Sequence, residues 1–447
     1  MSILDKIKII KFFTVVFTAS LFSCNSGAVN LFKPASLHEQ YKRKLISAGL
    51  DRTAMGTAWI KAADQSLEKA LSIKIPFRET GYFSAERVPA AAYRFTAVKG
   101  KKIQVSIVKK PAEQFMIYLD IMEIKDNGKS KLIASSDTLN SPISFDADEN
   151  ATYLIRMQPE LLRSGQYTLE ITSGPSLGYP LSTTGKNQIQ SFFGDGRDAN
   201  SRKHEGVDIF SAFRTPVVAA AAGTVTRVNE NNLGGKVVWL RPLNKDYTLY
   251  YAHLDRQIAV EGQQVLPGDT LGLMGNTGNA RTTAPHLHFG IYTSSGTIDP
   301  FPYINPVVNP APNISASLNN LNATVRTTNN TALHLLPDAG SAVIAALKSE
   351  NILHIGAANG AWYRAELPNG VIGFIRDNRV SSVTKPLRSI KIKAPSQPVY
   401  DHPDSLAAVK LTVKAGDEVS LLGQFEDYQL IIANNNESGW IKSLVKP

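Results

Sequence analysis

The residues best suited to chemistry are four histidines and one aspartate between positions 204 and 288. The chain has 447 residues and eight histidines, and half of the histidines fall in this interval. Histidine is the commonest metal ligand in proteins and titrates near neutral pH. A catalytic zinc ion takes three protein ligands from histidine, carboxylate or cysteine and leaves one position for water, which ionises near neutral pH. These residues therefore predict a metal-assisted hydrolytic site: His204, Asp208, His253, His286 and His288.

The spacing of the last two histidines fits a β-strand. His286-Leu-His288 runs into an apolar and aromatic stretch that ends at Tyr292, which is typical of a strand. Residues two apart on a strand share one face. His286 and His288 should therefore point the same way, with Leu287 directed into the core. The two imidazoles could serve one metal, or one could bind it while the other faces the substrate.

His204 and Asp208 are four positions apart, which would place them on one face of a helix. The intervening residues argue against a helix, because Gly206 is a poor helix former and Val207 and Ile209 favour strands. We therefore expect a loop that runs into a strand, with Asp208 near the start of that strand.

Each of these patterns is common when it stands alone. Two histidines two apart are more often part of a partly buried strand than a ligand set, and His253 in Tyr251-Ala-His-Leu254 could be a packed strand residue. Their joint occurrence, together with the neighbouring sequence, favours a site.

The neighbouring blocks resemble the lysostaphin-type (LytM-like) zinc metallopeptidases. They follow the order of that family over roughly residues 185 to 305, which makes the resemblance highly specific. The blocks are His204-Glu-Gly-Val-Asp-Ile209, Thr215-Pro-Val-Val-Ala-Ala220, Gly223-Thr-Val225, Tyr251-Ala-His-Leu254, Val265-Leu-Pro-Gly-Asp269, Gly275-Asn-Thr-Gly278, Pro285-His-Leu-His-Phe289 and Asp299-Pro300.

This resemblance implies a role for each residue of the cluster. His204, Asp208 and His288 match the ligands of one zinc ion. His253 and His286 match the two histidines that do not bind zinc but orient or deprotonate the attacking water and stabilise the tetrahedral intermediate. A zinc hydrolase needs such a proton acceptor and such a donor, but the sequence leaves open which histidine is the base.

Two neighbouring features modify this expectation. Glu205 stands beside a ligand, as in His-Glu-x-x-His enzymes, but an extended segment would point it away from its neighbours, so we assign it no catalytic role. The segment 279–284 is slightly longer than the corresponding loop of the resembled family. We expect this difference to affect cleavage specificity and not activity.

The N-terminus predicts export and a lipid anchor. Lysines precede an apolar stretch at 12–22, as in a signal peptide, and about eleven apolar residues are too few to span a bilayer. The stretch ends at Cys24, the only cysteine, which resembles a bacterial lipobox; the alternative is an ordinary signal peptide with an incidental cysteine. Asn25 favours the outer membrane of a diderm bacterium. A single cysteine also excludes an intramolecular disulfide.

The chain carries a formal net charge of +10 and a pI of about 9.4. This balance favours anionic partners, although a merely solvated basic surface would give the same numbers. No nucleic-acid motif is present in the sequence. Export makes the carboxylate-rich cell wall the expected partner.

The remaining sequence predicts a mainly β, multidomain chain. Alternating strands split by glycine turns at 76–176 indicate a β-sandwich, which we expect to act as a spacer or cover for the active site in preference to binding carbohydrate. The predicted parts are a lipoprotein signal peptide (1–23), a helical or linker segment (24–75), the sandwich (76–176), an antiparallel β-sheet peptidase domain with an open groove (177–305), a linker (306–320) and two small β-barrels (321–384 and 387–447).

The last two parts form an internal repeat with an offset of 66 residues that resembles bacterial SH3-like barrels. Gly373-Phe-Ile375 recurs as Gly439-Trp-Ile441, and Trp362 corresponds to Tyr428. We expect Phe374 and Trp440 to be core residues. Trp362 and Tyr428 could line a wall-binding groove or belong to the core.

These features together predict a lipid-anchored zinc metalloendopeptidase of the cell envelope that hydrolyses peptide bonds in peptidoglycan stem peptides or cross-links. One alternative is a catalytically inactive relative that binds the wall and activates an amidase. Another is an exported enzyme that acts on host or secreted proteins. The sequence indicates neither the bond cleaved nor a protein partner.

Overall fold

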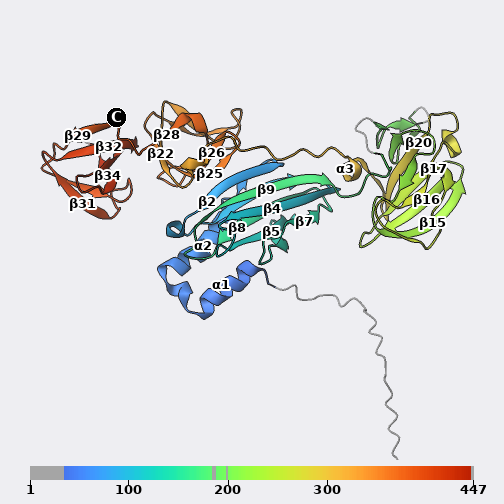
Figure 1. Ribbon diagram of the computed structural model, residues 1–447, viewed down its shortest axis with the longest axis horizontal. Helices are drawn as coiled ribbons and strands as arrows, with labels where there is room; N and C mark the ends of the chain where they lie inside the picture. Colours follow the sequence, from blue (N-terminus) through green and yellow to red (C-terminus); the bar gives the residue numbers. More distant parts are fainter. Residues whose placement is uncertain (1–34, 184–187, 198–199, 444–447) are drawn as a thin grey trace, which may run out of the picture. The chain divides into compact units, whose positions relative to one another are not determined.

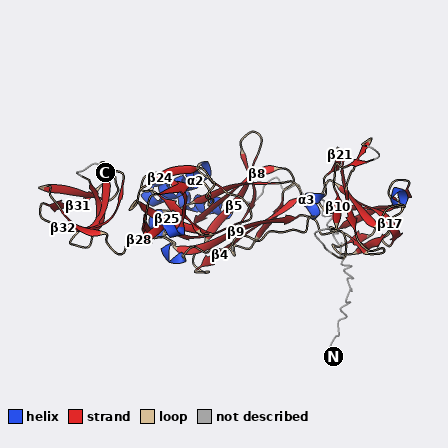
Figure 2. Ribbon diagram, turned by 90° about the horizontal axis from the view of Figure 1, so that it is seen from above, coloured by secondary structure: helices blue, strands red, loops and turns tan. Residues whose placement is uncertain are grey.

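The computed structural model describes residues 35–183, 188–197 and 200–443. Within this part of the chain most of the ordered backbone is strand, arranged in several sheets (Figures 1 and 2), which confirms the predicted mainly β, multidomain class. The predicted signal peptide and Cys24 lie outside the described residues. None of the helices described here is long and apolar enough to cross a bilayer.

Two helices, α1 (Leu37–Ser47) and α2 (Ala54–Glu68), begin the described chain. Each starts at a side-chain cap: Ser36 accepts a hydrogen bond from the amide of Glu39, and Thr53 accepts one from Gly56. The helices are held to the following sheet through Trp59, whose indole N–H donates to the carbonyl of Pro159 at 2.9 Å.

His38 of α1 is buried in the same contact. Its ring stacks on Trp59 with centroids 4.7 Å apart, its Nε2 lies 2.7 Å from the Gln158 amide oxygen, and Arg156 donates to its Nδ1 at 2.9 Å. Burial, and then the charge of Arg156, lower the pKa of His38 from 6.5 to about 4, against weaker opposing effects of Gln158 and Asp120.

This shift predicts acid sensitivity of the helical segment. Between pH 6.5 and about 4 the unfolded chain binds a proton at His38 that the folded chain does not, so stability is complete above pH 6.5 and falls as the pH drops towards 4. We expect a loss on the order of 2 kcal/mol, measured by urea unfolding at pH 7 and pH 4.5. His38→Gln should reduce this dependence without removing it, because burial also lowers the pKa of His253 and of His354 to about 4. An unchanged dependence in that variant would assign it to those other groups.

The strands at 71–175 form two sheets around one hydrophobic core, in which Ile121 and Leu169 are fully buried. One sheet has the order β1-β3-β8-β5-β6, and the other contains β2-β9-β4-β7. Their bounds are β1 Leu71–Ser72, β2 Phe77–Phe83, β3 Ala91–Ala97, β4 Lys101–Lys110, β5 Ile117–Ile124, β6 Ser130–Ser135, β7 Ile143–Asp146, β8 Ala151–Pro159 and β9 Gly165–Pro175.

The next sheet has the order β10-β13-β20-β17-β16-β15-β18, with β14, β19 and β21 paired to it. Its core includes Val207, Leu287 and Phe289, so alternation along β13 and β20 directs Asp208 and His288 to the other face. The strands are β10 Ile189–Ser191, β13 Val207–Phe210, β14 Pro216–Val218, β15 Gly223–Asn231, β16 Gly235–Pro242, β17 Thr248–Gln257, β18 Gln264–Val265, β19 Thr270–Met274, β20 His286–Thr293 and β21 Gly296–Ile298; a separate hairpin joins β11 Gly196–Arg197 to β12 Arg202–Lys203, and α3 spans Phe301–Ile304.

Two small β-units follow, which we call the first and second repeat units. Trp362 pairs with Arg376 in the first, and Tyr428 pairs with Lys442 in the second, each 66 positions further along. The first unit contains β22 Thr324–Thr327, β23 Thr331–His334, β24 Val343–Leu347, β25 Ile352–Asn359, β26 Trp362–Glu366, β27 Ile372–Arg376 and β28 Val380–Ser382; the second contains β29 Arg388–Lys391, β30 Ser396–Tyr400, β31 Val409–Lys414, β32 Glu418–Phe425, β33 Tyr428–Ile432 and β34 Ser438–Lys442.

One pairing joins segments that lie far apart in the sequence. β2 pairs antiparallel with β25, with Thr80 opposite Ala358, so the sandwich sheet continues into the first repeat unit.

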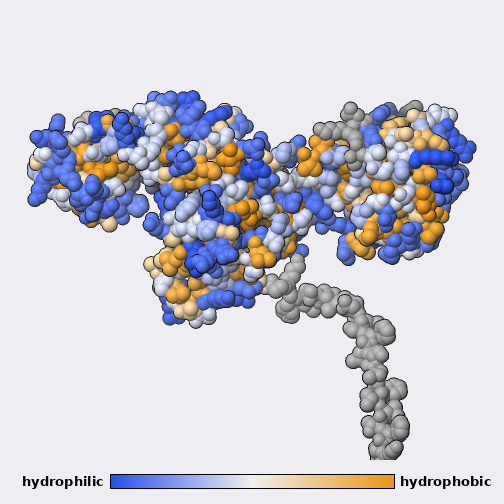
Figure 3. Space-filling model, in the orientation of Figure 1, coloured by the Kyte–Doolittle hydropathy of each residue, from blue (hydrophilic) through white to orange (hydrophobic). Residues whose placement is uncertain are grey.

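On the face drawn in Figure 3, hydrophobic side chains lie in small groups among hydrophilic ones.

Candidate active site

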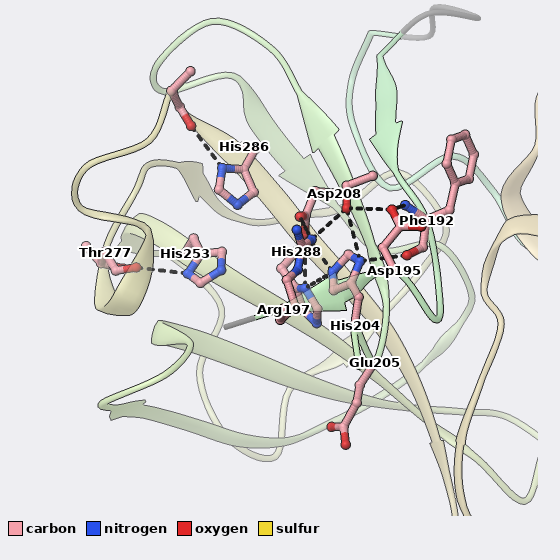
Figure 4. A network of polar contacts seen from close by, with 12 residues as sticks. Phe192, Asp195, Arg197, His204, Glu205, Asp208, His253, Thr277, His286 and His288 are labelled. Carbon is pink, nitrogen blue, oxygen red and sulfur yellow. Dashed lines mark hydrogen bonds and ion pairs between the residues drawn. The ribbon is translucent and has the colours of Figure 1, made fainter. Parts of the chain in front are cut away.

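Three of the predicted metal-binding side chains converge on one point. The Nε2 atom of His204 lies 2.9 Å from Nδ1 of His288 and 3.0 Å from Oδ1 of Asp208, and the last two atoms are 3.1 Å apart. The strand register explains this convergence, because Asp208 of β13 stands directly opposite His288 of β20. Figure 4 shows the three side chains pointing toward one another.

This triangle fits a zinc ion. Tetrahedral zinc with ligands at 2.0–2.2 Å places its ligand atoms about 3.3 Å apart, close to the separations found here. Nδ1 of His204 lies 2.9 Å from the carbonyl oxygen of Phe192, so this nitrogen carries the proton and the lone pair of Nε2 faces the centre. Two imidazoles and one carboxylate, with His204 and Asp208 buried, form a donor set that could hold a zinc ion.

Gly206 lets this local structure form. A Cβ at this position would lie 2.5 Å from the carbonyl oxygen of Phe289 and 2.8 Å from the ring of His288. The glycine in His204-Glu-Gly-Val-Asp208 therefore leaves room for a ligand ring on the adjacent strand.

Arg197 of β11 is a residue that the sequence did not reveal. Its Nη2 atom donates to Oδ2 of Asp208 and to Oγ of Ser191, both at 2.6 Å. The same Ser191 hydroxyl lies 3.2 Å from Nδ1 of His204. Arg197 thus occupies the second carboxylate oxygen of Asp208 and leaves Oδ1 for the metal, as outer partners of metal ligands commonly do. No motif or spacing marks an arginine in this hairpin.

We expect Arg197→Gln to weaken zinc binding by about 10- to 100-fold, because loss of an outer partner of a ligand has effects of this size. The measurement is competition for zinc against a fluorescent chelator, which does not depend on turnover. Arg227→Gln, on an exposed position of β15, is the matched control. Equal zinc affinity in the two variants would show that Arg197 does not contribute to zinc binding.

The other two histidines, His253 and His286, lie beside the triangle, and each has its Nδ1 atom close to a backbone carbonyl oxygen. Nδ1 of His253 lies 2.8 Å from the carbonyl oxygen of Thr277, and Nδ1 of His286 lies 2.9 Å from that of Ala284. Both Nδ1 atoms therefore donate, which leaves both Nε2 atoms free. The two rings are 4.9 Å apart, and the ring of His253 is 5.9 Å from that of His288.

His253 is held in an uncommon backbone conformation, with φ of 62°, which strained functional positions often adopt. The Gly275-Asn-Thr-Gly278 turn supports it, because Thr277 also donates through its hydroxyl to the carbonyl of Leu254. Burial, followed by the neighbouring His286 and His288, lowers the pKa of His253 to about 4. The imidazole is therefore neutral at pH 7, and its Nε2 atom carries a lone pair.

The remaining candidates lie outside this arrangement. Glu205 points away from the triangle (Figure 4) and accepts a 3.4 Å hydrogen bond from Tyr292, in line with our assigning it no catalytic role. Trp362 and Tyr428 lie in the repeat units and are largely buried, with exposed fractions of 6% and 8%.

Comparison with known proteins agrees with this geometry. Residues 202–300 match the model of Peptidase family M23. The chain carries a Peptidase family M23 domain. This match confirms the predicted peptidase resemblance, and the M23 domain contains all five residues of the predicted site.

Three relatives are similar to a part of this chain. The L-Ala--D-Glu endopeptidase of Bacillus subtilis is 33% identical over 138 residues, which cover 28% of this chain and 42% of the relative. The peptidoglycan DD-endopeptidase ShyC of Vibrio cholerae is 35% identical over 103 residues, 22% of this chain and 23% of the relative. The lipoprotein NlpD/LppB homolog of Pseudomonas aeruginosa is 32% identical over 138 residues, 30% of this chain and 42% of the relative. The chain thus spans less than half the length of each relative.

Proposed function

We propose that this protein is a zinc metalloendopeptidase that hydrolyses peptide bonds in peptidoglycan stem peptides or cross-links. The observation that carries the proposal is the complete set of three converging ligand atoms with two further histidines beside them. Two of the relatives are named as endopeptidases, one of them for peptidoglycan, which supports this class of substrate.

The side chains divide the chemistry between them. His204, Asp208 and His288 would hold zinc, which when bound activates water and polarises the scissile carbonyl. One of His253 and His286 accepts the proton of the attacking water at its Nε2 atom and passes it to the leaving amine. The other would donate a hydrogen bond from Nε2 to the oxygen that becomes negative in the tetrahedral intermediate, which requires its ring to take up one proton from solvent, since its Nδ1 proton is held by a backbone carbonyl.

Digestion of purified sacculi followed by mass spectrometry of the released muropeptides tests the proposal. We expect new peptide termini within the stem peptide or its cross-link, and none when the metal is chelated. Zinc bound without new termini would favour the alternative of a wall-binding activator of an amidase. The match to a lipoprotein NlpD/LppB homolog keeps that alternative as the second candidate.

We also propose that the protein is exported, anchored through lipid at Cys24 and held to peptidoglycan by the repeat units as SH3-like modules. A lipid anchor would confine the M23 domain to the envelope and raise its effective concentration at nearby wall. Metabolic labelling with a palmitate analogue should mark the native chain and not Cys24→Ser. Equal labelling of both would place the lipid elsewhere or exclude it.

A further inference from the structure

The first repeat unit contains a basic pocket that the proposed hydrolysis does not use. It has a volume of about 350 Å³ and is lined by Trp362, Arg376, Arg379 and His334 together with neutral residues. A volume of this size is at the lower end for small-molecule sites. No aspartate or glutamate lines it, so the two arginines carry the only formal charges of its lining.

The position of one arginine in this pocket is fixed by an aromatic ring. The guanidinium of Arg376 lies over the indole of Trp362, 4.8 Å from the ring centroid, across the pairing of β26 with β27. Such a cation–π contact orients the guanidinium and leaves its N–H groups for another partner. In the described part of the chain, neither Arg376 nor Arg379 lies within 4.0 Å of a carboxylate oxygen.

A histidine also packs against the indole. His334 packs edge to face on Trp362 with centroids 5.4 Å apart, and its Nδ1 lies 3.2 Å from the carbonyl oxygen of Ser341. That carbonyl fixes the proton on Nδ1. Among the described residues no hydrogen bond is found for Nε2, so this atom can bind a further polar group.

We propose that this pocket binds a carboxylate group of a peptide. Two arginines without acidic partners are suited to a planar carboxylate, which arginine binds through two parallel hydrogen bonds. The indole adds an apolar wall for the neighbouring part of the peptide. That the ligand carries a carboxylate is inferred from the pocket alone. That this ligand is a stem peptide of the cell wall rests on the proposed function.

The second repeat unit has different charges beside the corresponding aromatic residue. Tyr428 replaces Trp362 and pairs with Lys442 in the same register. The cavity that Tyr428 lines, about 650 Å³, contains Asp401, Asp404 and Glu426 but not Lys442. Three carboxyl groups would repel an anion, so this cavity is not expected to bind the same ligand.

The test is equilibrium binding of a synthetic stem pentapeptide, L-Ala-γ-D-Glu-L-Lys-D-Ala-D-Ala, to the full chain by isothermal calorimetry. A second peptide has the same sequence with every carboxylate amidated, and mass spectrometry of the recovered peptide separates binding from hydrolysis. We expect the free acid to bind at least about tenfold more tightly than the amide. Arg376→Gln should remove most of this preference, since hydrogen bonds to charged groups have effects of this size.

Lys442→Gln is the matched control, because it changes the corresponding position of the second repeat unit, and it should bind like the native chain. Trp362→Phe keeps an aromatic wall and should retain part of the affinity. Equal binding of the acid and the amide, or equal loss in Arg376→Gln and Lys442→Gln, would overturn the proposal. Binding of inorganic phosphate at Arg376 without binding of the peptide would also overturn it. Cleavage of sacculi by Arg376→Gln tests the M23 domain separately.

Discussion

His288→Ala should abolish stoichiometric zinc binding, whereas His286→Ala should keep the metal and lose turnover. His288 supplies one of three atoms that converge within 3.1 Å of one another, so its loss leaves two ligands, too few for a zinc site. His286 contributes no atom to this triangle, and its Nδ1 is engaged by a backbone carbonyl. Loss of a proton-transfer or oxyanion-stabilising group costs roughly 10²- to 10⁴-fold in rate.

Zinc content by elemental mass spectrometry and release of muropeptides should therefore separate the two variants. Added zinc should raise the melting temperature of the native chain and of His286→Ala, since a ligand that binds only the folded state stabilises it. It should not raise that of His288→Ala. His402→Ala changes an exposed histidine in the second repeat unit and should match the native chain in both measurements. Equal metal loss in the two site variants would overturn the division of roles.

The sequence predicted most of the side chains that converge in the candidate site, because their placement depends on local patterns. Alternation along a strand places His286 and His288 on one face, and the structure has both on β20 with Leu287 in the core. Gly206 and Val207 indicated a loop entering a strand, and β13 begins at Val207. The helices α1 and α2 lie in the segment expected to be helical or a linker (24–75), and caps at Ser36 and Thr53 set where each helix starts.

What the sequence did not reveal depends on contacts between distant segments. Arg197 reaches Asp208 only because a hairpin and a strand meet in three dimensions, and an arginine near a loop carries no local signal of that contact. The pairing of β2 with β25 joins residues more than 270 positions apart. The sandwich was expected to serve as a spacer or cover for the active site, and that role stays a prediction. Its pairing with the first repeat unit was not foreseen.

A buried charge cluster lies where this sheet passes from one unit to the other. Glu79 of β2 is fully buried, and its carboxylate is bound by Arg364 of β26 through two contacts of 3.1 Å. Tyr167 donates to the same carboxylate at 2.8 Å, and Tyr93 is bonded to it as well. A buried carboxylate is tolerated only when it is paired and hydrogen-bonded. The cluster therefore makes each unit depend on the other.

Arg364→Met should consequently destabilise the chain by about 3–5 kcal/mol, because it leaves Glu79 buried without a cation. The double variant Glu79→Leu with Arg364→Met should lose much less, since it removes both charges. Hydrogen exchange of β2 and β25, followed by mass spectrometry, measures the free energy of opening at this joint. Both strands should lose protection together in Arg364→Met.

The same joint provides the control for this prediction. Arg87 and Glu366 form an exposed ion pair at 3.2 Å, with side-chain exposures of 49% and 42%, and exposed pairs contribute about 0–1 kcal/mol. Arg87→Ala should therefore leave the protection of β2 and β25 almost unchanged. If Arg364→Met were as mild as Arg87→Ala, the units would be held by strand pairing alone. If the effect of Arg364→Met is severe, deletion of the first repeat unit would leave Glu79 without its cation and the edge of β2 without its partner strand. Loss of activity after such a deletion would then not by itself indicate that this unit binds the wall.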